Sequence, residues 1–189
     1  MLVTSSEPLT SIMNASSCVL VVDDDRNDIF LLRRGFHRAG LTADLFDLPD
    51  GVPALEYLRG SPPYDDRARF PFPDLLLLDL KMPRINGLNV LAWLAGRPDM
   101  KDLPALVLTS SSLQADREIA MKLGAREFLV KPTDSSDWVK LAQGLHQRWL
   151  APQNGSERIW KDLVVSQATS PGLPFQEAYE IADADVRGG

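Results

Sequence analysis

Three short apolar runs in this sequence each end in a charged residue, and this arrangement constrains the fold more than any other feature. The runs cover residues 19–22, 75–78 and 128–130. Asp23 and Asp24 follow the first run, Asp79 follows the second and Lys131 follows the third. In an all-parallel sheet a strand buried on both faces reads as a continuous apolar run, and ligands bind beyond the carboxyl ends of such strands. We therefore expect these four charges to meet at one edge of a parallel sheet.

Apolar segments and turn residues alternate along the chain in the way that strands alternate with helices. The expected strands begin near residue 17 and cover 43–47, 75–79, 105–108 and 127–130, and the expected helices cover 26–39, 53–60, 87–95, 114–123 and a last segment from 134 or 135. Five strands alternating with five helices predict a doubly wound α/β fold, a five-stranded parallel sheet in the order 2-1-3-4-5 with helices on both faces. In this order Asp24 and Asp79 face each other at the switch point.

The first helix has the clearest sequence signals. Asp25 is suited to cap its amino terminus, with Asp28 three residues further on. Ile29, Leu32 and Phe36 then form an apolar stripe at helical spacing. The pattern predicts a helix that packs this stripe against the sheet.

The chain divides into one domain and two extensions. Residues 1–16 are rich in serine and threonine without a period, and we expect a flexible arm there. The domain covers 17–150, and 151–189 form a carboxyl-terminal extension that we expect to be partly helical or disordered. The connection 61–73 is unusually long and rich in proline and aromatic residues, which is typical of a functional loop or a surface excursion.

Composition and charge exclude several classes of protein. With 44% hydrophobic and 24% charged residues, the chain can bury a sizeable core as a soluble globular protein. The net charge of −6 argues against general nucleic-acid binding, which needs a basic stripe. No apolar run is long enough to span a membrane. Cys18 is the one cysteine, so no internal disulfide can form, and we expect a reducing, cytoplasmic location.

The expected acidic cluster suits a magnesium ion. Mg²⁺ takes oxygen ligands in an octahedron, usually from one or two carboxylates and several waters. We expect Asp24 and Asp79 to supply the carboxylates, Asp23 to hold a metal-bound water, and a backbone carbonyl near Lys81 to complete the shell. Mn²⁺ is an alternative ion for the same oxygen ligands.

The same edge of the sheet carries groups suited to phosphoryl transfer. Asp79 is the expected nucleophile toward an in-line phosphoryl group, a reaction in which catalysis is mostly positioning and neutralisation of charge. Lys131 is the expected cation beside the phosphoryl group. Thr109, at the end of the fourth strand, offers a hydroxyl to a phosphoryl oxygen.

These motifs resemble the receiver domains of two-component response regulators over residues 17–150. The resemblance rests on the Asp-Asp pair after the first strand, the Asp-Leu-Lys-Met-Pro-Arg-Ile-Asn-Gly loop at 79–87, the Thr-Ser pair at 109–110 and the Lys-Pro pair at 131–132. It implies that Asp79 is the phosphoacceptor, that Asp23 and Asp24 are metal-site acids, that Thr109 is a switch hydroxyl and that Lys131 contacts the phosphate. It also implies Mg²⁺ as cofactor and a sensor histidine kinase as partner.

Three finer expectations follow from the resemblance. The peptide bond between Lys131 and Pro132 is expected to be cis. The switch aromatic is Phe128, which lacks a hydroxyl, so any hydrogen bond from that ring is lost. The proline-rich insertion, the bare receiver architecture and the entry to the first helix are similar to small regulators that pair with bacterial phytochromes and related hybrid kinases.

Other functions fit the residues less well. A phosphatase of the haloacid dehalogenase type wants a second Asp two residues after the nucleophile, where this chain has Lys81. A phosphorylation-independent adaptor would not need the full set of site residues, and a DNA-binding regulator would need a basic domain after residue 150. Within the receiver interpretation, signalling through protein contacts and service as a phosphate sink or phosphorelay intermediate both remain open. Such a protein is not an enzyme beyond its own phosphorylation and dephosphorylation.

The last helix suggests a surface for self-association. Trp138 and Trp149 share one side of it, and Trp149 lies near its end, beside the apolar residues of the tail. Large aromatic side chains at the edge of a domain favour contact with another surface. We expect a homodimer through the face made by the helix 114–123, the strand 127–130 and the last helix.

Overall fold

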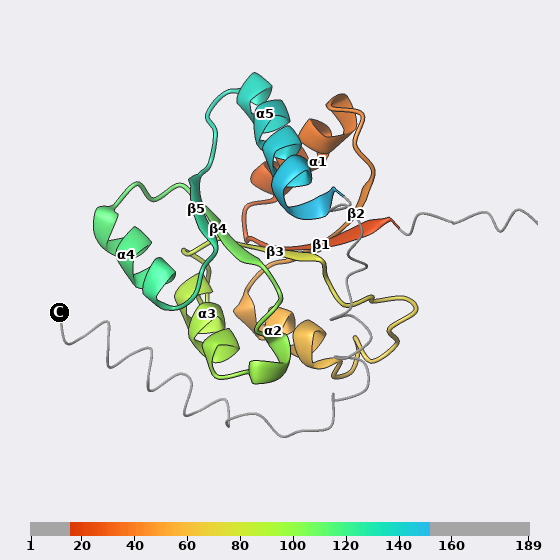
Figure 1. Ribbon diagram of the computed structural model, residues 1–189, viewed down its shortest axis with the longest axis vertical. Coiled ribbons are helices and arrows are strands. Elements are labelled where there is room, and N and C mark those ends of the chain that lie inside the picture. Colours follow the sequence, from red (N-terminus) through yellow and green to blue (C-terminus); the bar gives the residue numbers. More distant parts are fainter. Residues whose placement is uncertain (1–15, 152–189) are drawn as a thin grey trace, which may run out of the picture.

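A five-stranded parallel sheet in the order β2-β1-β3-β4-β5 runs through the computed structural model, which describes residues 16–151 (Figure 1). The strands are β1 (Ser17–Val22), β2 (Ala43–Leu48), β3 (Leu75–Leu78), β4 (Ala105–Thr109) and β5 (Glu127–Val130). The α-helices between and after them are α1 (Arg26–Arg38), α2 (Gly51–Arg59), α3 (Gly87–Ala95), α4 (Gln114–Lys122) and α5 (Ser135–Leu145). A 3-10 turn, η1 (Pro98–Met100), follows α3, and a π-helical turn, η2 (His146–Leu150), follows α5. The predicted fold and strand order are confirmed.

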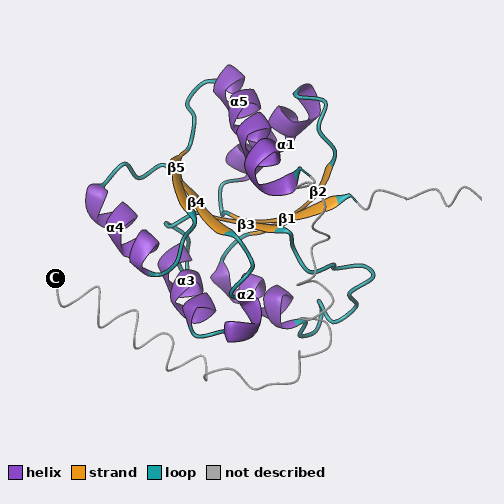
Figure 2. Ribbon diagram, in the orientation of Figure 1, coloured by secondary structure: helices purple, strands orange, loops and turns teal. Residues whose placement is uncertain are grey.

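The helices form one layer on each side of the sheet. α1 and α5 cover one face, and α2, α3 and α4 cover the other (Figure 2). This arrangement follows from the parallel strands, because each pair needs a crossover connection that packs its helix back onto the sheet. Since β1 lies between β2 and β3, the direction in which the sheet grows reverses at β1. The carboxyl ends of β1 and β3 therefore lie side by side at the switch point.

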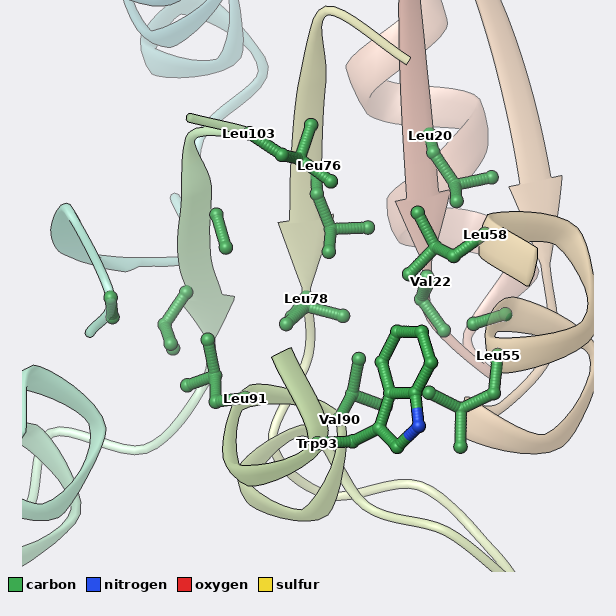
Figure 3. Packing of buried hydrophobic residues seen from close by; sticks show 14 of the residues in the cluster. Leu20, Val22, Leu55, Leu58, Leu76, Leu78, Val90, Leu91, Trp93 and Leu103 are labelled. Carbon is green, nitrogen blue, oxygen red and sulfur yellow. The ribbon is translucent and has the colours of Figure 1, made fainter. Parts of the chain in front are cut away.

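The central strands supply side chains to two separate apolar cores. Leu20 and Val22 of β1 point into the cluster under α2 and α3 (Figure 3), whereas Val19 and Val21 belong to the cluster under α1 and α5. The four leucines of β3 divide between the two clusters in the same alternating way. Successive side chains of a strand point to opposite faces, so a strand covered on both faces must be apolar throughout. This double burial holds the carboxyl ends of β1 and β3 in fixed positions.

α1 packs closely against α5. The side chain of Asp25 caps α1 by accepting a hydrogen bond from the backbone N–H of Asn27, as the sequence predicts. At Gly35 a Cβ atom would lie 2.6 Å from the carbonyl oxygen of Trp138, so the two helix backbones meet where only glycine fits. Trp138 itself is buried. The last helix is thus an integral part of the α1 side of the core.

The connection 61–73 folds back onto α2 instead of extending into solvent. Tyr64 and Phe70 pack against Tyr57 of α2, with ring centroids 5.3 and 6.0 Å away from the Tyr57 ring. The hydroxyl of Tyr57 donates a hydrogen bond to the carbonyl of Pro71, and the guanidinium of Arg67 donates to the carbonyl of Leu58 at the end of α2. The connection joins the end of α2 to the start of β3, so it lies at the edge of the sheet opposite to the predicted site.

The carboxyl-terminal part of the domain corrects the expectation for Trp149. Its side chain is half-buried, and its indole N–H donates a hydrogen bond of 3.1 Å to Glu127 at the start of β5. A guanidinium nitrogen of Arg148 lies 3.0 Å from the same carboxylate. Trp149 is therefore held by its own chain and is not a free aromatic surface. The predicted arm and tail, residues 1–15 and 152–189, lie outside the described residues.

None of the helices within residues 16–151 combines the length and the apolar character that a membrane span requires.

Candidate functional site

Asp23 and Asp79 stand at the carboxyl ends of the two central strands. The backbone N–H of Asp23 donates to the carbonyl of Leu48, and that of Asp79 donates to the carbonyl of Val22, at 3.0 and 2.9 Å. Each aspartate is thus still hydrogen-bonded to the neighbouring strand, one residue after its own strand ends. Both side chains are buried, at 4% and 5% exposure. The sheet itself places them next to each other.

The structure brings the three predicted acids together. One carboxylate oxygen from each of Asp23, Asp24 and Asp79 lies within 4.8 Å of the other two. Asp24 is exposed, so the cluster opens to solvent on its side. Three carboxylates at this spacing are the hard oxygen donors that Mg²⁺ prefers, and an opening to water suits an ion that keeps part of its hydration shell. The residues therefore fit a divalent cation.

Lys131 reaches into this acidic cluster from the end of β5. Its ammonium nitrogen lies 2.8 Å from a carboxylate oxygen of Asp23 and 3.6 Å from one of Asp79. The backbone N–H of Lys131 donates to the carbonyl of Thr109, which continues the pairing of β4 and β5 beyond Val130. All four charges that the sequence predicts to meet are thus in one cluster.

Asp28 is a further member of the cluster, although its place in the sequence indicates only the start of α1. Its carboxylate lies 2.8 Å from the ammonium nitrogen of Lys131 and does not serve as a cap. No local signal in the sequence connects Asp28 to Lys131, because the two residues lie far apart along the chain. Lys131 is therefore held between Asp23 and Asp28.

Burial and neighbouring charges shift two pKa values in the cluster. Burial raises the pKa of Asp23 to about 6, with a smaller contribution from the negative charge of Asp79, and the contact with Lys131 offsets only part of the rise. Burial lowers the pKa of Lys131, but the hydrogen bonds to Asp23 and Asp28 outweigh it and hold that pKa above its ordinary value. Lys131 is therefore a permanent cation in the cluster, whereas Asp23 changes its charge near neutral pH.

The carboxylate of Asp79 is oriented by its own backbone. One oxygen accepts a hydrogen bond of 2.8 Å from the N–H of Leu80, and the other faces Lys131. At Gly87 a Cβ atom would lie 2.3 Å from the carbonyl oxygen of Asp79. The end of the loop after β3 therefore packs directly on the backbone at its beginning. Lys81 lies in this loop with its side chain exposed.

The fourth and fifth strands carry the predicted switch residues. Thr109 is fully buried, and its hydroxyl oxygen accepts a hydrogen bond of 3.3 Å from the N–H of Ser111. The hydroxyl of Ser111 in turn donates to Asp116 in the first turn of α4. Phe128 is buried, with the guanidinium of Arg117 from α4 lying 4.7 Å from its ring centroid. Phe128 thus contacts α4 directly, and Thr109 is connected to α4 through Ser111.

The prediction of a cis peptide bond before Pro132 is wrong. Among residues 16–151 the cis bond is the one between Pro62 and Pro63, in the connection 61–73. A proline lowers the cost of a cis bond without fixing its choice, so the Lys-Pro pair did not determine the isomer.

Residues 19–143 match the sequence profile of the response regulator receiver domain. Response regulator Rcp1 of Synechocystis is 31% identical over 137 residues, which cover 72% of this chain and 91% of that protein. The structure of its Mn²⁺-bound form has a TM-score of 0.65 to this chain, at 30% identity over 75% of this chain and 99% of the other.

Two further solved structures are similar. RPA3017, a response regulator in red light signaling of R. palustris, has a TM-score of 0.68 at 32% identity, covering 74% of this chain and 99% of its own. The phosphorylated cyanobacterial phytochrome response regulator RcpA has a TM-score of 0.67 at 27% identity, covering 75% of this chain and 100% of its own. With the acidic cluster, the lysine and the strand order all in place, the chain belongs to the family of response regulator receiver domains.

Proposed function

We propose that this protein is a single-domain response regulator that accepts a phosphoryl group on Asp79 from a sensor histidine kinase. The observation that carries the proposal is the position of the Asp79 carboxylate, which is buried beside two further carboxylates and 3.6 Å from the ammonium of Lys131. In the transfer, an oxygen of Asp79 forms a bond to phosphorus while the bond from phosphorus to the kinase histidine breaks, which leaves an acyl phosphate. The reaction needs a positioned carboxylate and neutralised phosphoryl oxygens more than it needs covalent chemistry.

The proposed cation is Mg²⁺, with Mn²⁺ as a substitute, held by Asp23, Asp24, Asp79 and the backbone carbonyl of Lys81. The clustered carboxylates support this proposal, as does the Mn²⁺-bound form of the relative Rcp1. When bound, the ion neutralises charge on the phosphoryl oxygens. Lys131 supplies a second positive charge, and the Leu80 N–H holds the Asp79 carboxylate in one orientation.

We propose that Thr109 and Phe128 report the phosphorylated state. The Thr109 hydroxyl stands at the end of β4, next to the strand that Asp79 follows, and a phosphoryl oxygen on Asp79 would offer it a charged acceptor. A shift of this hydroxyl would change its bond with the Ser111 N–H and, through Ser111, the start of α4. Phe128 has no hydroxyl to donate, and the polar group that its ring meets on α4 is the guanidinium of Arg117.

The proposed partner is a kinase of the phytochrome type or a related hybrid kinase. The similarity to Rcp1, RPA3017 and RcpA supports this choice. Output through protein contacts is the function that we favour, with a phosphate sink or phosphorelay intermediate as the alternative. A cytoplasmic location and the absence of nucleic-acid binding stay predictions from the sequence.

Self-association through the face of α4, β5 and α5 also stays a proposal, now on different residues. Large apolar side chains are exposed there at Leu113, Met121 and Val130, at 60%, 45% and 47%. Exposed apolar groups on one face favour contact with another surface. These residues take the place of Trp149, which is held by Glu127.

The phosphoacceptor is tested by incubating the full chain with acetyl phosphate and Mg²⁺ and measuring its intact mass. We expect the mass of one phosphoryl group to be added, and none in Asp79→Asn. Asp44→Asn, an exposed carboxylate on β2, is the matched control and should be phosphorylated like the unmodified chain. Undiminished uptake in Asp79→Asn would exclude Asp79 as the acceptor.

A further inference from the structure

Asp50 is a buried carboxylate that lies outside the acidic cluster. Its side chain is 3% exposed, and one of its oxygens accepts a hydrogen bond of 2.7 Å from the N–H of Val52, which caps α2. Its other oxygen accepts from the guanidinium of Arg84 and forms an ion pair with it. Arg84 lies in the loop that follows Asp79. A single carboxylate thus connects the start of α2 to the loop after β3.

The backbone of Arg84 is held in an uncommon conformation. Its φ is 61°, and it is the one non-glycine residue with a positive φ within residues 16–151. A residue with a Cβ atom is disfavoured in this region, and such a conformation persists only where the surroundings fix it. The ion pair with Asp50 is one such restraint.

Backbone contacts next to this ion pair restrain the same loop. The N–H of Gly51 donates a hydrogen bond of 3.1 Å to the carbonyl of Ile85. A Cβ atom at Gly51 would lie 2.4 Å from Cγ2 of Ile85, so the loop rests directly on the start of α2. Ile85 is buried. Two adjacent loop residues are therefore fixed on α2, one through its charge and one through packing.

The restrained segment is the one that carries Lys81. It begins at Asp79, where the N–H of Leu80 holds the carboxylate, and it ends at Gly87, whose N–H donates a hydrogen bond of 3.3 Å to the carbonyl of Leu80. Between these ends, the contacts of Arg84 and Ile85 with α2 hold it from outside. When a backbone carbonyl binds a cation, its position depends on the conformation of the loop that contains it.

We propose that Asp50 and Arg84 are positioning residues for the cation site. Their ion pair holds the loop 80–86 in the conformation in which the Lys81 carbonyl joins the carboxylates of the acidic cluster. Neither residue belongs to the carboxylate cluster that would hold the cation. This inference rests on the proposed function, because it assigns to the pair a role in the cation binding proposed above.

The test compares Arg84→Ala, Arg84→Gly and Asp50→Asn in the full chain. Arg84→Gly removes the ion pair, and glycine adopts a positive φ without strain. Comparing it with Arg84→Ala therefore separates the effect of the ion pair from that of backbone strain. Asp50→Asn keeps an oxygen that accepts from the Val52 N–H, so α2 stays capped. Arg33→Ala is the matched control, because it removes a half-exposed arginine–aspartate pair, with Asp47, that does not involve the loop.

Calorimetric titration with Mg²⁺ is the first measurement. We expect affinity to fall about tenfold in all three variants, as for outer contacts that orient metal ligands. We expect the double variant Asp50→Asn/Arg84→Ala to lose no more than either single variant, because both changes remove one interaction. Arg33→Ala should bind like the unmodified chain.

Hydrogen exchange of residues 80–86 in the metal-free chain is the second measurement. We expect faster exchange in the three variants and an unchanged rate in Arg33→Ala, with a cooperative thermal transition in each variant showing that the fold is kept. Unchanged Mg²⁺ affinity in Arg84→Ala and Arg84→Gly would overturn the inference. If the unmodified chain bound no Mg²⁺, the proposed function would fail and this inference would not be decided by affinity. An unchanged exchange rate in the variants would then still refute the restraint of the loop 80–86 by the ion pair.

Discussion

The ammonium of Lys131 lies at the same distance, 2.8 Å, from Asp28 on α1 as from Asp23 after β1. Asp79, the proposed phosphoacceptor, is its more distant partner at 3.6 Å. The lysine is thus held by two carboxylates at the distance of a strong hydrogen bond and faces the third. Its position depends on α1 as well as on the sheet.

Replacing Asp28 with Asn should slow phosphorylation without removing it. The variant keeps the size of the side chain but removes one of the two charges that hold Lys131. We expect the rate of phosphorylation by acetyl phosphate to fall about tenfold, as when other contacts that orient a functional side chain are removed. Intact mass over time measures the rate, with Asp44→Asn as control. An equal rate in Asp28→Asn would show that Asp23 alone positions the lysine.

The affinity for Mg²⁺ should depend on the protonation of Asp23. Burial raises the pKa of this carboxyl to about 6, and a carboxylate must lose its proton to take part in binding a metal ion. We expect affinity to be level above about pH 7 and to fall by up to about tenfold per pH unit below about pH 6. Calorimetric titrations across this range measure it, and Asp23→Asn should flatten the profile. A persistent slope in Asp23→Asn would assign the proton to another group.

The same pKa gives the sign of the pH dependence of stability in the metal-free chain. Between about pH 4 and about pH 6, Asp23 is mostly protonated in the folded state and mostly ionised in the unfolded chain. The free energy of unfolding should therefore decrease with rising pH across this window, as far as Asp23 determines it. Urea denaturation of the chain and of Asp23→Asn, in the presence of a chelator, isolates the contribution. A difference between the two chains that did not change with pH would contradict the assignment.

Gly35→Ala should destabilise the fold, whereas Gly144→Ala should not. At Gly35 the added Cβ would lie 2.6 Å from the Trp138 carbonyl oxygen, which the backbone of α5 holds in place. We expect a loss of about 1–3 kcal/mol in the free energy of unfolding, as for other overpacked sites. At Gly144 the nearest atoms are 3.5 Å away on the flexible side chain of Arg148, and alanine should stabilise α5 by about 0.5–1 kcal/mol. Chemical denaturation of both variants measures the contrast, and equal stabilities would refute the close packing of α1 on α5.

Self-association should depend on Met121 and Val130. Replacing both with lysine places charge on the exposed face of α4 and β5. We expect the dimer to dissociate at concentrations where the unmodified chain is dimeric, because buried unpaired charges oppose association. Phe30→Lys is the matched control, since Phe30 is exposed to a similar degree, at 60%, on α1. Light scattering on the three chains measures their oligomeric state. A monomeric unmodified chain would refute the dimer, and equal dissociation of Phe30→Lys would refute the assigned face.

The sequence predicted the fold because its strongest signals are local and repeated. The apolar runs of β1 and β3 and the Asp25 cap each specify their element without reference to the rest of the chain. The bounds of α3 and β5 agree residue by residue with the prediction, and the remaining ends shift by one or two residues, as helix and strand ends commonly do.

The sequence could not predict contacts that depend on how the elements are placed in space. The sequence places Asp28 at the start of a helix, and its contact with Lys131, which follows β5, forms only in the folded chain. The sequence indicates that Trp149 is an aromatic residue at the edge of the domain. The π-helical turn after α5 brings its indole to Glu127. Arg84 reads as a loop residue, because nothing local connects it to Asp50, which is 34 residues away.

The close packing of α5 on α1 also affects how the chain is made. Trp138, Ala142, Leu145 and Leu150 complete the core on the α1 side of the sheet, and they are the last part of the domain to be synthesised. Until they leave the ribosome, the side of α1 that faces α5 and the part of the sheet beneath α5 lack the cover that these residues supply. A nascent chain that has already formed β1 to β4 therefore exposes the part of its core that α5 covers, and exposed apolar surface of this kind favours aggregation or capture by chaperones. The final helix thus determines when during translation the domain becomes safe from misassembly.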